Sequence, residues 1–89
     1  MNADESGAEL NQLTEKIIGC AYTVSNKLGV GFLEKVYENA LAIEIRKAGL
    51  SASQQVQIKV HYEGINVGDF IADLLINNNI IVELKATKQ

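Results

Sequence analysis

The stretch 69–87, with the sequence DFIADLLINNNIIVELKAT, constrains the fold more than any other part of this chain. It contains two apolar runs rich in isoleucine and leucine, which are separated by three asparagines at 77–79. Runs of this kind bounded by turn residues are typical of largely buried strands, and asparagine tolerates the left-handed backbone that tight loops require. The stretch therefore predicts two apolar strands joined into a β-hairpin.

Three charged side chains, Asp73, Glu83 and Lys85, interrupt this apolar hairpin. If the asparagines form a three-residue loop, Ile76 pairs with Ile80. The same register places Asp73 opposite Glu83 on the face that carries Lys85, whereas a two-residue loop would move Asp73 to the other face. Two carboxylates and a lysine at one place could hold a hard cation and polarise an oxygen. The alternative is a solvated face with a cross-strand ion pair.

The composition fits one small domain with a core, because 47% of the 89 residues are apolar. Three of the eleven acids lie among the first nine residues, so residues 10–89 carry eight acidic and eight basic side chains and no basic patch indicates nucleic-acid binding. No run is long enough to span a bilayer and the start does not resemble a signal peptide, so we expect a cytoplasmic protein without a membrane partner. The single cysteine, Cys20, lies in an apolar segment, where we expect a buried and unreactive thiol.

Helical spacing dominates the first part of the chain. Ser6 and Glu9 fit a capping box, so we expect a helix to start there and Gly29 to end it. We expect residues 1–8 to be a flexible N-terminus and residues 9–89 to form a single domain. The predicted apolar face of this helix consists of Leu10, Leu13, Ile17, Cys20, Ala21, Val24 and Leu28.

A second helix is predicted over about 33–48, with Gly49 as its end. Its mostly buried residues are predicted to be Val36, Tyr37, Ala40, Leu41, Ile43 and Ile45. After Gly49, polar and apolar residues alternate, which predicts a strand with one solvent-exposed face. The segment 62–65 predicts a hairpin turn. The expected fold is therefore α+β, with two N-terminal helices followed by a three-stranded antiparallel β-meander and both helices on one face of the sheet.

The connection between the predicted helices carries a second pattern, in which Gly31, Glu34 and Tyr37 are spaced three residues apart. Glu34 falls in the first turn of a helix, where a carboxylate interacts favourably with the helix dipole. Tyr37 lies one turn further on and is predicted to be a core residue with a hydrogen-bonded hydroxyl group. By themselves these residues predict structural roles.

The pattern Gly31-x-x-Glu34-x-x-Tyr37 resembles the signature of the GxxExxY proteins, which are placed in the PD-(D/E)XK nuclease superfamily with its restriction-endonuclease-like fold. The resemblance extends over about 13–86, which is most of the chain. Further matching positions are Ile17-Ile18-Gly19, 28–34, Gln55, Tyr62-Glu63-Gly64, Asp73-Leu74-Leu75 and 82–86. The ordered set is more specific than the heptapeptide alone.

The resemblance implies a nuclease that hydrolyses phosphodiester bonds with Mg²⁺ or Mn²⁺, on DNA in preference to RNA. It implies catalytic roles for Asp73, Glu83 and Lys85. The implied metal ligands are Glu34, Asp73, Glu83 and the carbonyl group of Leu84. We expect the three acids to converge around one ion, with the lysine on the same face to stabilise charge on the phosphate.

Three features depart from the family pattern. Ala72 stands where the superfamily has proline, and Ser25 stands where we expect histidine. The sequence ends at Gln89, whereas relatives continue into a further helix and strand, so we expect an incomplete, C-terminally truncated αβββαβ core with little activity alone. Apolar residues on both sheet faces then predict self-association, or a partner that covers the open face. The alternatives are a non-catalytic module that binds nucleic acid or protein, and a small interaction protein whose charges are coincidental.

Overall fold

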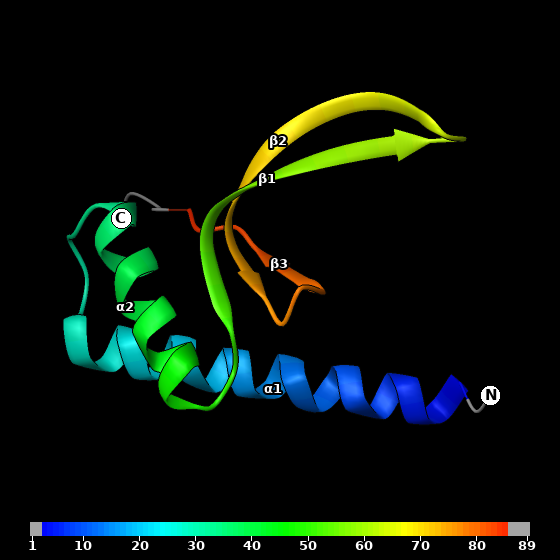
Figure 1. Ribbon diagram of the computed structural model, residues 1–89. Helices are drawn as coiled ribbons and strands as arrows, with labels where there is room; N and C mark the ends of the chain where they lie inside the picture. The colour runs from blue at the N-terminus through cyan, green and yellow to red at the C-terminus, as the bar shows by residue number, and fades with distance from the viewer. Residues whose placement is uncertain (1–2, 86–89) are drawn as a thin grey trace.

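The computed structural model describes residues 3–85, in which two helices pack against one face of an antiparallel sheet (Figure 1). The elements are α1 (Ala3–Leu28), α2 (Glu34–Lys47), β1 (Ala52–Tyr62), β2 (Ile65–Ile76) and β3 (Ile80–Val82). The strands lie in the order β1-β2-β3, and each is antiparallel to its neighbour. The predicted α+β class and the β-meander are confirmed. In this part of the chain, neither helix has the length and apolar character that a membrane crossing requires.

The helices end close to where the sequence predicts, but α1 begins earlier. α1 ends at Leu28, and Gly29 follows with a φ of 74°, which glycine adopts without strain. α2 lies within one residue of both predicted bounds, and Gly49 comes shortly after it. The predicted helix start at Ser6 is wrong, because α1 already begins at Ala3. Alanine and glutamate favour the helix, so the segment before the expected capping box continues it.

The loop between β2 and β3 has the predicted three-residue form. Ile76 pairs with Ile80 across it, and the φ angles of Asn77 and Asn78 are 51° and 61°. A left-handed backbone at two successive asparagines closes this loop without a glycine. The predicted register, which decides the face of each residue on the hairpin, is therefore confirmed up to Val82.

The core lies between the helices and the inner part of the sheet. Its buried members are Ile17, Cys20, Val24, Leu41, Ala42, Ile45, Leu74 and Ile76. The predicted burial of Cys20 is thus confirmed. In the predicted face of α1, Leu10 and Ala21 are exposed, because each lines an open groove instead of the core.

Burial on α2 differs from the predicted set. The buried residues are Glu38, Leu41, Ala42 and Ile45, which repeat at helical spacing. Val36 and Ile43 are 39% and 55% exposed, so their predicted burial is wrong. They lie off the side of the helix that contacts α1 and the sheet, and an apolar side chain is buried only where another element covers it.

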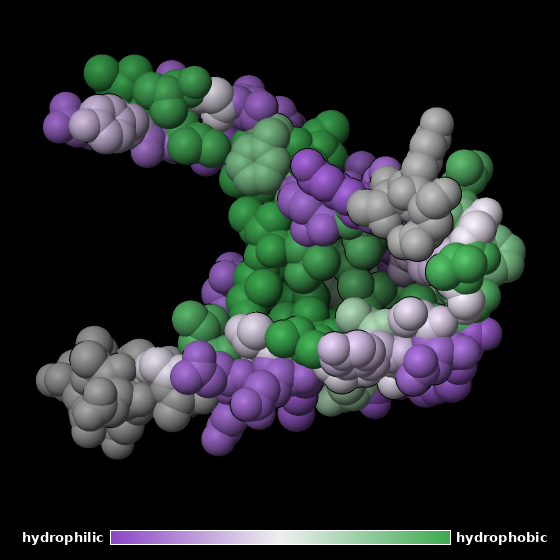
Figure 2. Space-filling view, turned by 180° about the vertical axis from the view of Figure 1, so that it is seen from behind, coloured by the Kyte–Doolittle hydropathy of each residue, from purple (hydrophilic) through white to green (hydrophobic). Residues whose placement is uncertain are grey.

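The β1–β2 hairpin divides into an inner half and an outer half. The inner half, residues 52–56 and 72–76, lies over the helices, and Leu74 and Ile76 are fully buried there. The outer half, residues 57–71, projects away from the helices (Figure 1) and overhangs a hollow with an apolar wall (Figure 2). The predicted turn closes it, with φ angles of 51° at Glu63 and 82° at Gly64.

Candidate active site

Asp73 lies on β2, partly buried, next to the segment that follows β3. Its Oδ2 atom accepts a hydrogen bond of 2.8 Å from the backbone N–H group of Leu84. β3 ends at Val82, so this bond continues the contact between the two chain segments beyond the regular ladder. Glu83 and Lys85 flank Leu84, and the bond therefore holds the Glu-x-Lys segment against the aspartate.

The predicted convergence of Glu34, Asp73 and Glu83 is not found. Among the side chains that the structure describes, no three acids, histidines or cysteines form a group that could hold a metal ion. Glu34 lies in the first turn of α2, as predicted, and its side chain is exposed. Glu83 is exposed beyond β3. The acid of α2 that faces the sheet is Glu38, one helical turn after Glu34. The individual roles of the predicted residues stay predictions.

Glu38 is the functional candidate that the sequence analysis missed. It is 4% exposed, and its carboxylate accepts hydrogen bonds from Lys35 Nζ at 3.0 Å, Gln54 Nε2 at 2.6 Å and Gln55 Nε2 at 2.7 Å. Burial by itself raises the pKa of Glu38, but these three donors outweigh it and hold the pKa below the ordinary range of glutamate. Glu38 is therefore a buried carboxylate that is charged at neutral pH.

The sequence does contain a signal for Glu38. It lies three residues before Leu41 and seven before Ile45, which puts it on the buried face of the helix. A carboxylate on such a face needs donors from another element, because an unpaired buried charge is costly. Adjacent glutamines at 54 and 55 in the following strand are suitable donors, but their contact with α2 depends on tertiary packing.

Gln55 connects Glu38 with Asp73. Its Nε2 atom donates to Glu38 Oε1 at 2.7 Å and to Asp73 Oδ1 at 3.4 Å. The β1–β2 ladder pairs the residues on both sides of Gln55 but not Gln55 itself, whose φ is 54°. A left-handed backbone is unfavourable for a residue with a side chain, so surrounding contacts must hold it. We refer to Glu38, Gln54, Gln55 and Asp73 as the carboxylate cluster.

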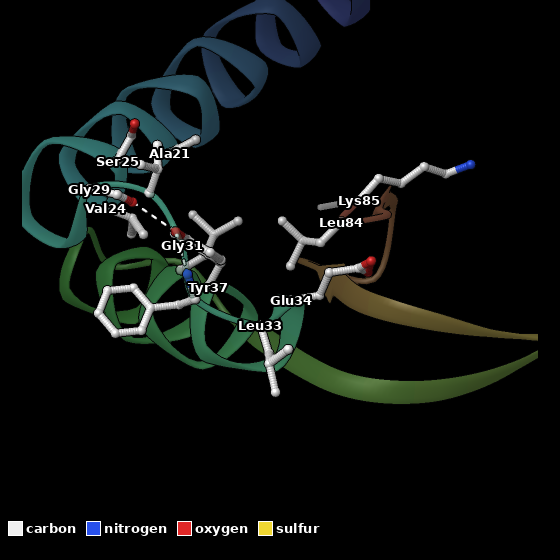
Figure 3. A pocket seen from close by; sticks show the side chains of 13 residues that line it. Ala21, Val24, Ser25, Gly29, Gly31, Leu33, Glu34, Tyr37, Leu84 and Lys85 are labelled. Carbon is white, nitrogen blue, oxygen red and sulfur yellow. Dashed lines mark hydrogen bonds between the residues drawn. The ribbon is translucent and has the colours of Figure 1, made fainter. Parts of the chain in front are cut away.

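A groove of about 840 Å³ lies between the end of α1, the start of α2 and the segment that follows β3 (Figure 3). Glu34 lies on one wall, while Leu84 and Lys85 come from the other (Figure 3). The remaining lining residues are Ala21, Val24, Ser25, Gly29, Val30, Gly31, Phe32, Leu33, Tyr37 and Leu41. Three of the residues predicted to be catalytic or metal-binding therefore border one groove, next to the backbone bond that Leu84 makes with Asp73.

The motif Gly31, Glu34 and Tyr37 shapes this groove. The hydroxyl group of Tyr37 donates a hydrogen bond of 2.8 Å to the carbonyl oxygen of Gly29 and accepts one of 3.3 Å from the N–H group of Phe32. The predicted hydrogen-bonded hydroxyl is thus confirmed. Gly31, between these two anchors, has a φ of 104°, which a residue with a side chain rarely adopts. The motif fixes the loop that forms one wall of the groove.

The chemistry of the cluster fits a hard cation such as Mg²⁺. In proteins this ion is bound by one or two carboxylates and keeps several water ligands, which phosphate oxygens can replace. Glu38 and Asp73 supply two carboxylates that share one amide donor. Lys85 is exposed and makes no ion pair with the carboxylates of the described residues, so its ammonium group is available to an anion.

A family model for the PD-(D/E)XK nuclease superfamily matches residues 11–89. The match includes the carboxylate cluster, the groove motif and the segment 83–85. The observed order of two helices followed by a three-stranded antiparallel sheet is consistent with the fold of that superfamily. No curated protein and no solved structure matches the chain significantly.

Proposed function

This chain belongs to the PD-(D/E)XK nuclease superfamily, and we propose that it hydrolyses phosphodiester bonds in DNA with the help of a bound Mg²⁺ ion, which Mn²⁺ can replace. The observation that carries this proposal is the hydrogen bond from the N–H group of Leu84 to Asp73. It joins an aspartate on one strand to the Glu-x-Lys segment after the next strand. These are the residue types that the family resemblance assigns to phosphodiester hydrolysis.

Asp73 and Glu38 are the residues that we propose to hold the ion, with Glu83 and the carbonyl group of Leu84 as nearby oxygen donors. When bound, Mg²⁺ lowers the pKa of a water ligand and offsets negative charge on the phosphate. Glu34, exposed on the facing wall of the groove, is a further candidate acid for the same ion. We prefer Glu38 to Glu34 because Glu38 is buried and because the side-chain amide of Gln55 donates hydrogen bonds to both Glu38 and Asp73.

Lys85 is proposed to stabilise the negative charge that develops on the phosphate. Its ammonium group lies beside a groove and makes no ion pair with another described residue. It is well placed for this role, because charge stabilisation that strengthens in the transition state accelerates the chemical step. The groove beside Lys85 is proposed to receive the substrate strand. Its apolar lining suits the face of a base, while phosphate remains near Lys85 and the carboxylate cluster.

We also propose that the chain belongs to the GxxExxY subgroup, and the structural roles of Gly31 and Tyr37 in one loop support this. A cytoplasmic location is proposed as well. A reducing compartment suits the buried free thiol of Cys20, which has no disulfide partner in this sequence.

The test is cleavage of labelled double-stranded DNA and of RNA with Mg²⁺, with Mn²⁺ and with a chelator. We expect Asp73→Asn and Lys85→Ala to lower the rate about 10²- to 10³-fold, because each removes a group that acts on the reacting phosphate. Matched controls are Asp69→Asn, on the exposed outer half of the same strand, and Lys59→Ala on β1. Cleavage that persists in chelator, or full activity of Asp73→Asn, would contradict the proposal.

Metal titration of two further variants separates the candidate acids of α2. We expect Glu38→Gln to weaken Mg²⁺ binding more than Glu34→Gln does. Titration calorimetry in the absence of nucleic acid measures this directly. The opposite order would assign the metal to Glu34 and leave Glu38 with a structural role.

One observation favours a second candidate function, a non-catalytic module that binds nucleic acid. Both oxygens of Glu38 already accept hydrogen bonds, and the described side chains do not gather a third acid around them. Fluorescence anisotropy with labelled DNA in chelator distinguishes the two functions. Binding without a metal, together with no cleavage in Mg²⁺ or Mn²⁺, would favour the binding module over the nuclease.

A further inference from the structure

The side-chain amide of Gln55 lies between the two acids of the carboxylate cluster. One nitrogen, Nε2, is 2.7 Å from Glu38 Oε1 and 3.4 Å from Asp73 Oδ1. An amide nitrogen carries two hydrogens, so it can serve both carboxylates at once. The two acids come from α2 and β2, and Gln55 comes from β1, so this single group ties three elements together.

The backbone of Gln55 is distorted at this point. Its φ is 54°, and the β1–β2 ladder has no pair at its position although the flanking residues are paired. Gln57, two residues further along β1, pairs regularly with Ile71, and its side chain is exposed. Strained backbone of this kind persists only where the surrounding contacts determine it. The bonds to Glu38 and Asp73 are the contacts that distinguish Gln55 from Gln57.

Two carboxylates held around one point repel each other unless positive charge or N–H donors offset them. In the metal-free protein the Gln55 amide is the donor that faces both acids. A cation placed between the same oxygens would offset this repulsion more strongly than the amide does, because it carries a full positive charge. The amide hydrogens and a cation cannot occupy that position together.

We propose that Gln55 takes the place of the metal ion in the metal-free protein and must be displaced when Mg²⁺ binds. This inference rests on the proposed function, since it concerns the same two carboxylates. Gln55 then preserves the arrangement of Glu38 and Asp73 between metal-binding events, and it lowers the affinity for the ion by competing with it. Gln54 and Lys35 donate to the other oxygen of Glu38 and remain in place during the exchange.

The test compares metal affinity and metal-free stability in the whole chain. Gln55→Gly removes the amide while allowing the left-handed backbone, and Gln55→Ala removes it while keeping a Cβ atom. Gln57→Ala is the matched control, because it deletes a glutamine from the same strand with no side-chain hydrogen bond among the described residues. Titration calorimetry with Mg²⁺ and with Mn²⁺ measures affinity without any nucleic acid.

We expect both Gln55 variants to bind Mg²⁺ roughly tenfold more tightly than the wild type, because the ion no longer displaces a hydrogen bond to a charged group. In chelator, we expect the melting temperature of Gln55→Ala to fall by about 5 °C, and Mg²⁺ to restore it. Gln57→Ala should match the wild type in both measurements.

Equal or weaker binding by both Gln55 variants would overturn the inference, and clearly weaker binding would show instead that the Gln55 amide oxygen is a metal ligand. In that case the proposed nuclease function stands, because the wild type still binds the ion. If neither the wild type nor the variants bind Mg²⁺ or Mn²⁺, the proposed metal-dependent function fails and the inference fails with it.

Discussion

The inner and outer halves of the β1–β2 hairpin are formed by the same two strands but have opposite surroundings. In the inner half Leu74 and Ile76 are completely buried, whereas in the outer half Ile65 and Val67 are 67% and 60% exposed. The inner half lies over α1 and α2, while the outer half stands away from both helices (Figure 1). Alternation thus specifies which residues share a face, but burial requires a second layer.

The polar residues of the two halves differ in the same way. Asp73, in the inner half, accepts hydrogen bonds from Leu84 and Gln55, which are distant in sequence. Asp69, in the outer half, accepts a bond of 3.2 Å from Asn66, three residues away. Long-range polar contacts occur where packing brings segments together, and this places the candidate chemistry at the inner half.

The largest expected effect tests the burial difference. Leu74→Ala should lower the free energy of unfolding by about 2–5 kcal/mol, because it leaves a cavity in the core. Val67→Ala, on the same strand in the outer half, should change it by less than about 0.5 kcal/mol. Urea unfolding followed by circular dichroism measures both. Similar losses in the two variants would mean that the outer half is covered in solution, for example by a second copy of the chain.

A smaller effect is expected at the buried acid of the inner half. Glu38→Gln replaces an acceptor oxygen by an NH₂ group that faces the donors Gln54 and Gln55. This should lower the free energy of unfolding by about 1–3 kcal/mol at neutral pH. Because the pKa of Glu38 is lowered in the folded state, its stabilising contribution is present above the ordinary pKa of glutamate and is lost as the pH falls through the lowered value.

The stability difference between wild type and Glu38→Gln should therefore be largest near neutral pH and shrink on acidification. Unfolding curves at several pH values between neutral and acidic measure this difference. A matched variant is Glu63→Gln, which makes the same substitution at the exposed hairpin turn. A constant difference at all pH values would mean that the charge on Glu38 does not contribute.

The smallest effect concerns the turn of the outer half. Glu63 has a φ of 51°, and asparagine is favoured over glutamate at this position of a two-residue turn. Glu63→Asn should raise the free energy of unfolding by a few tenths of a kcal/mol, up to about 0.5 kcal/mol. Thermal melting measures the change. If the variant is less stable, the turn does not set the conformation of the outer half.

Local sequence signals predicted much of the fold. Gly29 marks the end of α1, and the three asparagines fix the register through Ile76 and Ile80. These features depend on backbone preferences of single residues, which act over a few positions along the chain. The burial of Val36 was predicted wrongly, because burial is not a local property: it depends on what packs against each side of the helix.

In the candidate site, too, some features follow from local sequence and others depend on tertiary packing. The sequence by itself determined the strand register that brings the segment 83–85 beside Asp73, because turn geometry and side-chain alternation are local properties of the chain. Only the tertiary structure decided that the face of α2 that carries Glu38 meets the strands, where Glu38 shares the Gln55 amide with Asp73. That choice depends on the rotation and position of α2 against the strands, and these are set by packing of the whole core.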